Sequence, residues 1–311
     1  NDETTNSSLY TVRVLAPFLS VSTASPDEWP SISRQDMTSP VDVLIVTPLP
    51  KERDAMLAKL PNHERVDSDG LVYYFSKVPI TFPGGRKGIY RVVVMNLDQA
   101  GQVEAAVGVM KAAPRWNPAV VLLVGIAGGV KAAQVSPGDV LVADRVAYSG
   151  LQKVKPAFRE IRWDMEHVDR ELHRAIQNFP IGRCRSITAD RPDDGNPQLH
   201  IGPMVTGDDV VASEEELKKY MATVPKLIGI EMEAWGIMRA IAETGRSFLM
   251  IRGVSDLADA AKDDRWHEYA CDVAASKSSI SLPVCSTANC SKEEVSVMGD
   301  PVRKRCDGAC T

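Results

Sequence analysis

The sequence predicts an α/β fold: a single three-layer domain in which a mostly parallel, mixed central sheet is covered by helices on both faces. Residues 43–46, 120–124 and 248–251 are apolar at every position, as is typical of strands that are buried on both faces. Such runs alternate with segments of helical periodicity, which indicates parallel strands joined by helices. The 311 residues are 44% hydrophobic and 25% charged, so the chain can bury a substantial core.

The expected elements occupy the middle of the chain. The expected strands are apolar runs that end at glycine, proline or polar residues. They cover residues 43–46, 71–78, 90–95, 120–124, 139–143, 227–230 and 248–251. The expected helices begin at caps such as Ser213 or stop before breakers such as Pro114. They cover residues 51–60, 102–113, 168–179, 214–221, 231–244 and 264–276.

The two ends of the chain lack this alternation. Residues 1–40 are rich in Ser, Thr, Pro and Asp, which predicts a partly disordered N-terminal extension with one short segment able to form a strand. Residues 279–311 are predicted to be an irregular tail or linker, and they contain four of the six cysteines. Because the cysteine spacings differ from the C-x2-C of zinc knuckles, no metal site is expected.

The charge and hydropathy of the chain exclude several classes of partner. A formal net charge of -5 gives no field that would attract nucleic acid or an acidic membrane. No apolar run approaches the ~20 residues that a membrane-spanning helix needs. Residues 1–8 lack the basic and apolar regions of a signal peptide. We therefore expect a small-molecule partner, no nucleic acid, no membrane and a cytoplasmic location.

Four groups of glycine or charged residues come directly after expected strands. They are Glu52, residues 125–129, residues 231–233 and residues 252–256. In sheets of this kind, ligands bind outside the carboxyl ends of the strands. The four groups are therefore expected to converge on one site.

Residues 125–129 read Gly-Ile-Ala-Gly-Gly. Glycine has no side chain, so the backbone there can approach a ligand closely. The alternative is a turn that packs a strand against a helix. The segment has no G-x-G-x-x-G spacing, and no Gly-Lys-Ser/Thr follows, which disfavours dinucleotide binding and a P-loop.

The charged groups each allow a structural and a chemical interpretation. Glu231 and Glu233 can interact with the dipole of an apolar helix, worth ~0.5 kcal/mol, or accept hydrogen bonds from the diol of a ribose. Arg252 and Asp256 can form a structural ion pair, or Asp256 can pass a proton to a heteroaromatic leaving group. Glu52 can lie on a solvated helix face or belong to the same site.

These residues, in this order, resemble the purine nucleoside and uridine phosphorylase superfamily, and especially its nucleosidase branch. The branch includes methylthioadenosine/S-adenosylhomocysteine nucleosidase-type domains, some of them fused to ankyrin or NACHT modules in immune-like proteins. The resemblance covers about residues 41–275, and we interpret residues 41–278 as the catalytic domain. The motifs that carry it are Val124–Gly129, Gly138–Val140, Thr206–Asp208, Gly229–Ala234, Arg252–Asp259 and Lys262–Ala270.

The resemblance implies a role for each charged residue. Asp256 matches the acid that donates a proton to purine N7, and Glu52 matches the glutamate that deprotonates the attacking water. Glu233 matches the carboxylate that binds the ribose hydroxyls, with Met232 beneath the sugar. Arg252 is expected to hold the nucleophile or the ribose side.

The base site is less well matched. The resemblance places Ala127 and Gly128 beside the base, with Ser255 also expected to contact substrate. The aromatic residue that stacks on adenine in the family falls near Val210, so base binding must differ or use another ring such as Trp235.

Two departures from the family favour water over phosphate as the nucleophile. The phosphate-binding arginine and serine of the phosphorylases correspond to Leu123 and Ile126 here, and phosphate needs charge-assisted donors. We therefore expect hydrolysis of the N-glycosidic bond of a purine, most simply adenine, nucleoside or nucleotide, with Glu231 and Glu233 around the ribose. No metal or organic cofactor is required, and a homo-oligomer (dimer or higher) is expected. The alternatives are phosphorolysis and a non-catalytic nucleotide-sensing module of a larger signalling protein.

Overall fold

The structure is a computed structural model of the chain. It describes residues 20–21, 30–60, 62–81, 87–156, 159–177, 187–211, 213–258 and 264–285. Most of the predicted N-terminal extension, the end of the tail and residues 259–263 lie outside the described residues.

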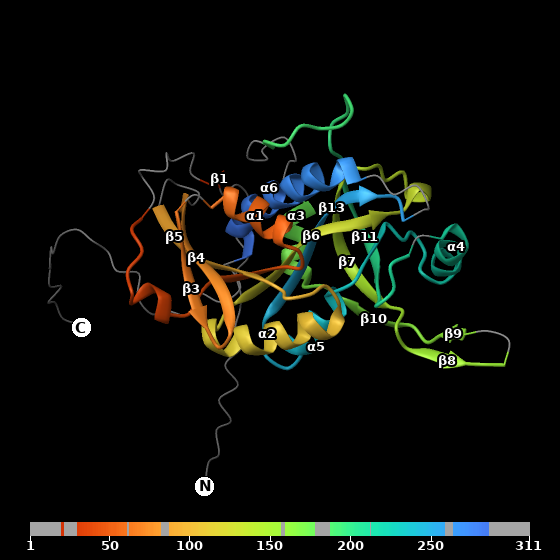
Figure 1. Ribbon diagram of the computed structural model, residues 1–311, viewed down its shortest axis with the longest axis horizontal. Coiled ribbons are helices and arrows are strands. Elements are labelled where there is room, and N and C mark those ends of the chain that lie inside the picture. Colours follow the sequence, from red (N-terminus) through yellow and green to blue (C-terminus); the bar gives the residue numbers. More distant parts are fainter. Residues whose placement is uncertain are drawn as a thin grey trace, which may run out of the picture.

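A large mixed sheet forms the centre of the molecule (Figure 1). Its strands are β1 (Ser20–Val21), β2 (Val43–Thr47), β3 (His63–Ser68), β4 (Leu71–Thr81), β5 (Lys87–Asn96), β6 (Val120–Gly129), β7 (Val140–Tyr148), β10 (Asp164–His167), β11 (Leu199–Thr206), β12 (Gly229–Glu231) and β13 (Ser247–Asp256). A separate hairpin comprises β8 (Gln152–Val154) and β9 (Arg159–Ile161).

The parallel pairings lie in the middle of the sheet. Strand β2 pairs in parallel with β5 and β6, β6 with β13, and β7 with β11, which also pairs in parallel with β12. Antiparallel pairings extend the sheet at its edges, as between β4 and β5 and between β7 and β10, and two more lie in the middle, between β12 and β6 and between β13 and β7. The predicted mixed sheet is thus confirmed, and residues at the carboxyl ends of β2, β6, β12 and β13 lie close together.

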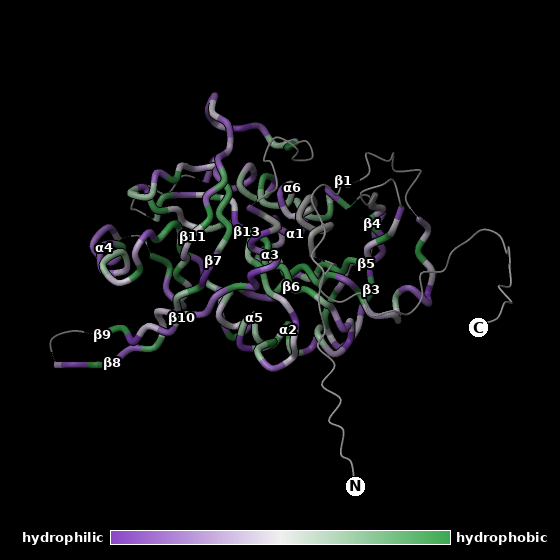
Figure 2. The backbone as a smooth tube through the Cα atoms, turned by 180° about the vertical axis from the view of Figure 1, so that it is seen from behind, coloured by the Kyte–Doolittle hydropathy of each residue, from purple (hydrophilic) through white to green (hydrophobic). Residues whose placement is uncertain are grey.

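Helices cover both faces of the sheet, as the sequence predicts. They are α1 (Pro50–Ala58), α2 (Gln102–Trp116), α3 (Arg170–Gln177), α4 (Glu214–Thr223), α5 (Ala234–Ile241) and α6 (His267–Cys285), with single 3-10 turns between them. Helices α1 and α6 contact each other on one face, while α2 and α5 contact each other on the opposite face (Figure 1). Figure 2 shows that the hydrophobic segments gather in the middle of the molecule, around β6, which is almost entirely buried.

Several boundaries differ from the prediction. The glycine-rich residues 125–129 are not a turn: they continue β6 and pair with β13, so that Gly125 lies opposite Arg252. Helix α5 begins after Glu233, because Glu231 still belongs to β12. Helix α6 continues to Cys285, beyond the predicted helix end at residue 276.

Two further differences have clear causes. Helix α2 continues through Pro114 to Trp116, because the Trp116 indole packs into the core against Tyr73 and Phe75. Strand β11 was missed, because its glycine and proline interrupt the apolar pattern. The ladder between β7 and β11 shifts its register between Gly202 and Pro203, which is how a strand accommodates such residues.

Candidate active site

Glu52 enters the site from the first turn of α1. Pro50 starts this helix, and the Glu52 carboxylate accepts a hydrogen bond from the Leu49 backbone N–H at 2.6 Å. It accepts another from the Ile126 N–H on β6 at 2.7 Å. Glu52 is only 2% exposed, so it does not lie on a solvated helix face. Burial raises the pKa of Glu52 to about 7, although Arg252 and the two backbone donors act in the opposite direction.

The Arg252 guanidinium is surrounded by three carboxylates. Its Nη2 contacts Glu231 directly and lies 2.7 Å from Oε2 of Glu233, while its Nη1 lies 4.0 Å from Oε1 of Glu52. All four side chains are buried, and charges removed from water need such partners. Burial by itself lowers the pKa of Arg252, but the carboxylates outweigh it and raise the pKa above its usual range. The alternative structural pair of Arg252 with Asp256 is not among these contacts.

Gly125 makes this arrangement possible. A β-carbon at this position would overlap both the Glu52 carboxylate and the Arg252 guanidinium. Any other residue would therefore separate the charged groups or displace β6. The absence of a side chain at Gly125 thus allows protein groups to approach each other closely, rather than a ligand to approach the backbone.

The two glutamates after β12 are held differently. Glu231 accepts hydrogen bonds from the backbone N–H groups of Glu233 and Ala234, so its carboxylate caps the start of α5. Glu233 accepts one from the Gly101 N–H at 3.0 Å. Burial raises the pKa of Glu233, while Arg252 lowers it. Arg252 and two backbone N–H groups therefore hold the Glu231 carboxylate. Glu233 accepts from one backbone N–H, so it is the carboxylate better placed for a ligand.

Gln102 supports the candidate site from outside the cavity lining, and sequence reasoning missed it. It is buried at the start of α2, where its Nε2 donates to Thr206 Oγ1 at 2.5 Å and its Oε1 accepts from the Gly236 N–H at 2.8 Å. It thereby ties α2 to β11 and α5, beside the Gly101 amide that holds Glu233. The only signal in the sequence was a glutamine directly after a glycine at the start of an apolar helix.

Asp256 lies at the end of β13 and lines the same cavity as Glu52. Its Oδ2 accepts a hydrogen bond from the Ser255 hydroxyl at 3.0 Å, and its Oδ1 accepts one from the Ala258 N–H at 2.9 Å. Ala258 has a positive φ of 52°, a conformation that costs a non-glycine residue energy and is often found at functional sites. The carboxyl group is half-buried, so it can contact both protein donors and a ligand.

A cavity of about 230 Å³ brings the predicted residues together. Apart from Trp235, the residues predicted from the sequence to act in catalysis or to bind substrate all line it: Glu52, Ala127, Gly128, Val210, Glu231, Met232, Glu233, Arg252, Ser255 and Asp256. Leu49, Ile126 and His267 also line it. Their roles toward a substrate stay predictions.

Trp235 does not supply the missing base-stacking ring. Its indole stacks on Tyr148 at a centroid distance of 5.3 Å and an angle of 2°, and it is not part of the cavity lining. Val210 does line the cavity, with 61% of its surface exposed. Among the described residues that line the cavity there is no phenylalanine, tyrosine or tryptophan.

Residues 42–282 match the family model of the phosphorylase superfamily. The chain belongs to this superfamily. The match covers every strand of the central sheet except β1 and all the site residues, so the family predicted from the motifs is confirmed.

Superfamily members similar to the chain include two curated ATP nucleosidases. A death domain-containing ATP nucleosidase from Amphimedon queenslandica is 27% identical over 258 residues, which cover 77% of this chain and 48% of the relative. The ATP nucleosidase Cap17 from Escherichia coli is 26% identical over 269 residues, which cover 80% and 52%. The chain thus spans about half the length of these relatives.

A solved structure supports the fold. The 5'-methylthioadenosine/S-adenosylhomocysteine nucleosidase from Colwellia psychrerythraea, in complex with adenine, matches with a TM-score of 0.62. It is 21% identical, and the match covers 80% of this chain and 96% of that one. The nucleoside phosphorylase-like fold is therefore confirmed. In the part of the chain that the structure describes, no helix combines the length and apolarity needed to cross a membrane.

Proposed function

We propose that the chain hydrolyses the N-glycosidic bond of an adenine nucleoside or nucleotide. The observation that carries this proposal is the placement of two kinds of carboxyl group in one cavity. Glu52 is buried, with a pKa raised to about 7, and Asp256 lies half-buried at the end of β13. A base near neutrality and a separate acid suit a reaction in which one group is deprotonated while another is protonated. The named nucleosidase relatives support the same reaction.

Each charged residue of the cavity has a separate role in the proposed reaction. Water attacks C1′ as the bond from C1′ to the purine nitrogen breaks, and Glu52 accepts the proton that the water loses. Asp256, in its acid form, gives a proton to the departing base, which leaves with the electron pair of the broken bond. Glu233 accepts hydrogen bonds from the ribose hydroxyls, and Arg252 fixes its position at 2.7 Å.

Phosphorolysis is disfavoured by the electrostatics of the cavity. A phosphate dianion needs charge-assisted donors. Among the residues that line the cavity, Arg252 is the permanent cation, and it already contacts two carboxylates and faces a third. Ile126 offers a backbone N–H, but Glu52 accepts it. A water molecule carries no charge, so it does not need the donors that the carboxylates already use.

Release of adenine tests the proposal directly. The purified chain, dialysed free of phosphate, is expected to release adenine and a free ribosyl product from adenine nucleosides or nucleotides. Recovery of activity only with added phosphate, with ribose 1-phosphate as product, would establish phosphorolysis instead. Tight nucleotide binding without any release of base would support the sensing module.

We also propose that the chain forms a homo-oligomer through α2. Val103, Val107 and Met110 lie at intervals of four and three residues on this helix, and they are 71%, 44% and 63% exposed. Such spacing places them on one helix face, and contiguous exposed apolar residues are typical of interfaces. Light scattering of the wild type and of Val107→Glu tests this: a dimer that becomes a monomer supports it, and a monomeric wild type contradicts it. A cytoplasmic location remains part of the proposal.

A further inference from the structure

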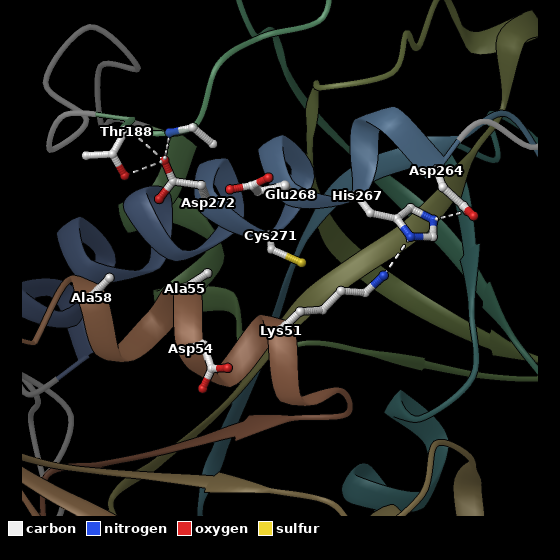
Figure 3. Close-up of a pocket in the computed structure, with 11 residues that line it drawn as sticks. Lys51, Asp54, Ala55, Ala58, Thr188, Asp264, His267, Glu268, Cys271 and Asp272 are labelled. Atoms are coloured by element: carbon white, nitrogen blue, oxygen red, sulfur yellow. Dashed lines mark hydrogen bonds and ion pairs between the residues drawn. The ribbon is translucent and has the colours of Figure 1, made fainter.

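A second cavity, of about 640 Å³, lies between α1 and α6 (Figure 3). Its charged lining consists of Lys51, Asp54, Asp264, His267, Glu268 and Asp272. The Cys271 thiol lines it as well, but burial raises the pKa of this thiol to about 12. Since a nucleophilic cysteine must be a thiolate near neutral pH, the cavity is suited to binding rather than to thiol chemistry.

Lys51 and His267 meet across the two helices. Nζ of Lys51 lies 2.6 Å from Nδ1 of His267, and Figure 3 shows the lysine side chain reaching from α1 to the ring. Oδ1 of Asp264 lies 3.4 Å from the other ring nitrogen, Nε2. A lysine ammonium group has three hydrogens, so this contact leaves it able to donate to a ligand.

His267 connects this cavity with the candidate active site, because it lines both. The active-site cavity, at about 230 Å³, is smaller than the ~300–1,000 Å³ of most small-molecule sites, whereas the second cavity lies within that range. In the proposed reaction the base lies at Asp256 and the ribose hydroxyls at Glu233. Leu49 and His267 line the same cavity and contact neither of these assigned positions, so they are available to the 5′ carbon.

We propose that Lys51, positioned by His267, binds the 5′-phosphate of the substrate, so that the chain prefers adenine nucleoside 5′-phosphates to uncharged nucleosides. This inference rests on the proposed function and specifies the substituent that the second cavity receives. Phosphate oxygens accept charge-assisted hydrogen bonds from an ammonium group. The contact between Lys51 and His267 places this ammonium group beside a residue that lines both cavities.

The carboxylates of the second cavity are compatible with this location. Asp272 forms a buried ion pair with Lys59, and Asp54 lies 2.8 Å from an Arg53 nitrogen. Glu268, next to His267 on α6, would repel a phosphate that moved deeper along the helix. A 5′ substituent carrying an amino group would show the opposite preference, since Lys51 would repel it and Glu268 would attract it.

The test compares AMP with adenosine as substrates, measured as the ratio of their kcat/KM values. We expect the wild type to prefer AMP, and Lys51→Gln to lower the ratio about tenfold, as for the loss of one hydrogen bond to a charged group. Lys51→Arg keeps the charge and should retain most of the preference. Glu268→Gln should raise the ratio, because it removes a repulsion. Lys218→Gln is the control: it removes one charge from an exposed lysine on α4, outside the lining of both cavities.

The outcomes separate this inference from the proposed function. Adenine release from adenosine with no preference for AMP, or a ratio that Lys51→Gln leaves unchanged, would overturn the phosphate subsite and leave the hydrolase intact. A reversed pattern, with Lys51→Gln raising the ratio and Glu268→Gln lowering it, would assign the cavity to a cationic substituent. No release of adenine from either substrate would overturn the proposed function and this inference together.

Discussion

The Glu52 carboxylate lies 4.0 Å from the Arg252 guanidinium, and each of these side chains is at most 2% exposed. Even so, burial is the larger influence on Glu52 and raises its pKa to about 7. The arginine is shared with Glu231 and Glu233, so its charge is already largely balanced. The relationship leaves Glu52 able to gain and lose a proton near neutral pH, as a general base must.

The first prediction concerns the pH dependence of Glu52. Because the base must be ionised and its pKa is raised to about 7, kcat is expected to fall as the pH decreases through about 7. Glu52→Gln should lower kcat by ~10² or more, since the amide cannot accept a proton, and should remove this limb of the profile. Arg53→Gln, on the same helix, is the control. An unchanged acidic limb in Glu52→Gln would assign the titration to another group.

The second prediction concerns Asp256. An asparagine keeps the size of the side chain but has no carboxyl proton to give, so Asp256→Asn should lower kcat by ~10² to 10⁴. The Ala258 N–H can still donate to the amide oxygen, so the melting temperature should change little. Near-normal kcat in the folded variant would reduce Asp256 to a structural acceptor for Ser255 and Ala258.

The third prediction tests the ribose contact of Glu233. The wild type should cleave ribosides better than 2′-deoxyribosides, because only ribosides offer the hydroxyl that the carboxylate accepts. In Glu233→Gln this difference should narrow, measured as the ratio of kcat/KM values for the two substrates. A wild type that does not distinguish the two sugars would remove Glu233 from the ribose site.

The fourth prediction concerns the stability supplied by Arg252. Arg252→Met removes the cation and leaves Glu231 and Glu233 buried without their shared partner. Breaking a buried ion pair from one side costs about 3–5 kcal/mol, so the free energy of unfolding in denaturant should fall by that order. Because burial raises the pKa of Glu233, this carboxylate gains a proton as the pH falls, and the loss of stability should then shrink. A variant as stable as the wild type at pH 8 would show that the carboxylates find other partners.

The sequence was sufficient to predict the residues that follow strands. Glu52, Gly128, Glu233 and Asp256 all lie near carboxyl ends of neighbouring strands, and the geometry of an α/β sheet brings such ends together. Their convergence in one cavity needed only the strand positions. The same reasoning also gave the helices on both faces.

Other parts of the site depend on contacts that no local pattern reports. Lys51 and His267 are 216 residues apart, so their meeting follows from how α1 packs against α6. Gln102 is a polar residue in an apolar helix, and its two hydrogen bonds depend on β11 and α5. The glycine-rich segment was misread as a turn because glycine has little strand preference, whereas pairing with β12 and β13 keeps it extended.

Helix α2 connects the exposed apolar face proposed for association with the backbone amide that holds Glu233. Its outer face presents Val103, Val107 and Met110, while the amide of Gly101, directly before its first turn, holds Glu233. A helix of 15 residues moves nearly as one body, so a tilt imposed on its outer face also shifts that amide. The proposed association through this face would therefore make turnover per molecule depend on protein concentration. Dilution should separate the copies and weaken the affinity for the sugar before the chain unfolds.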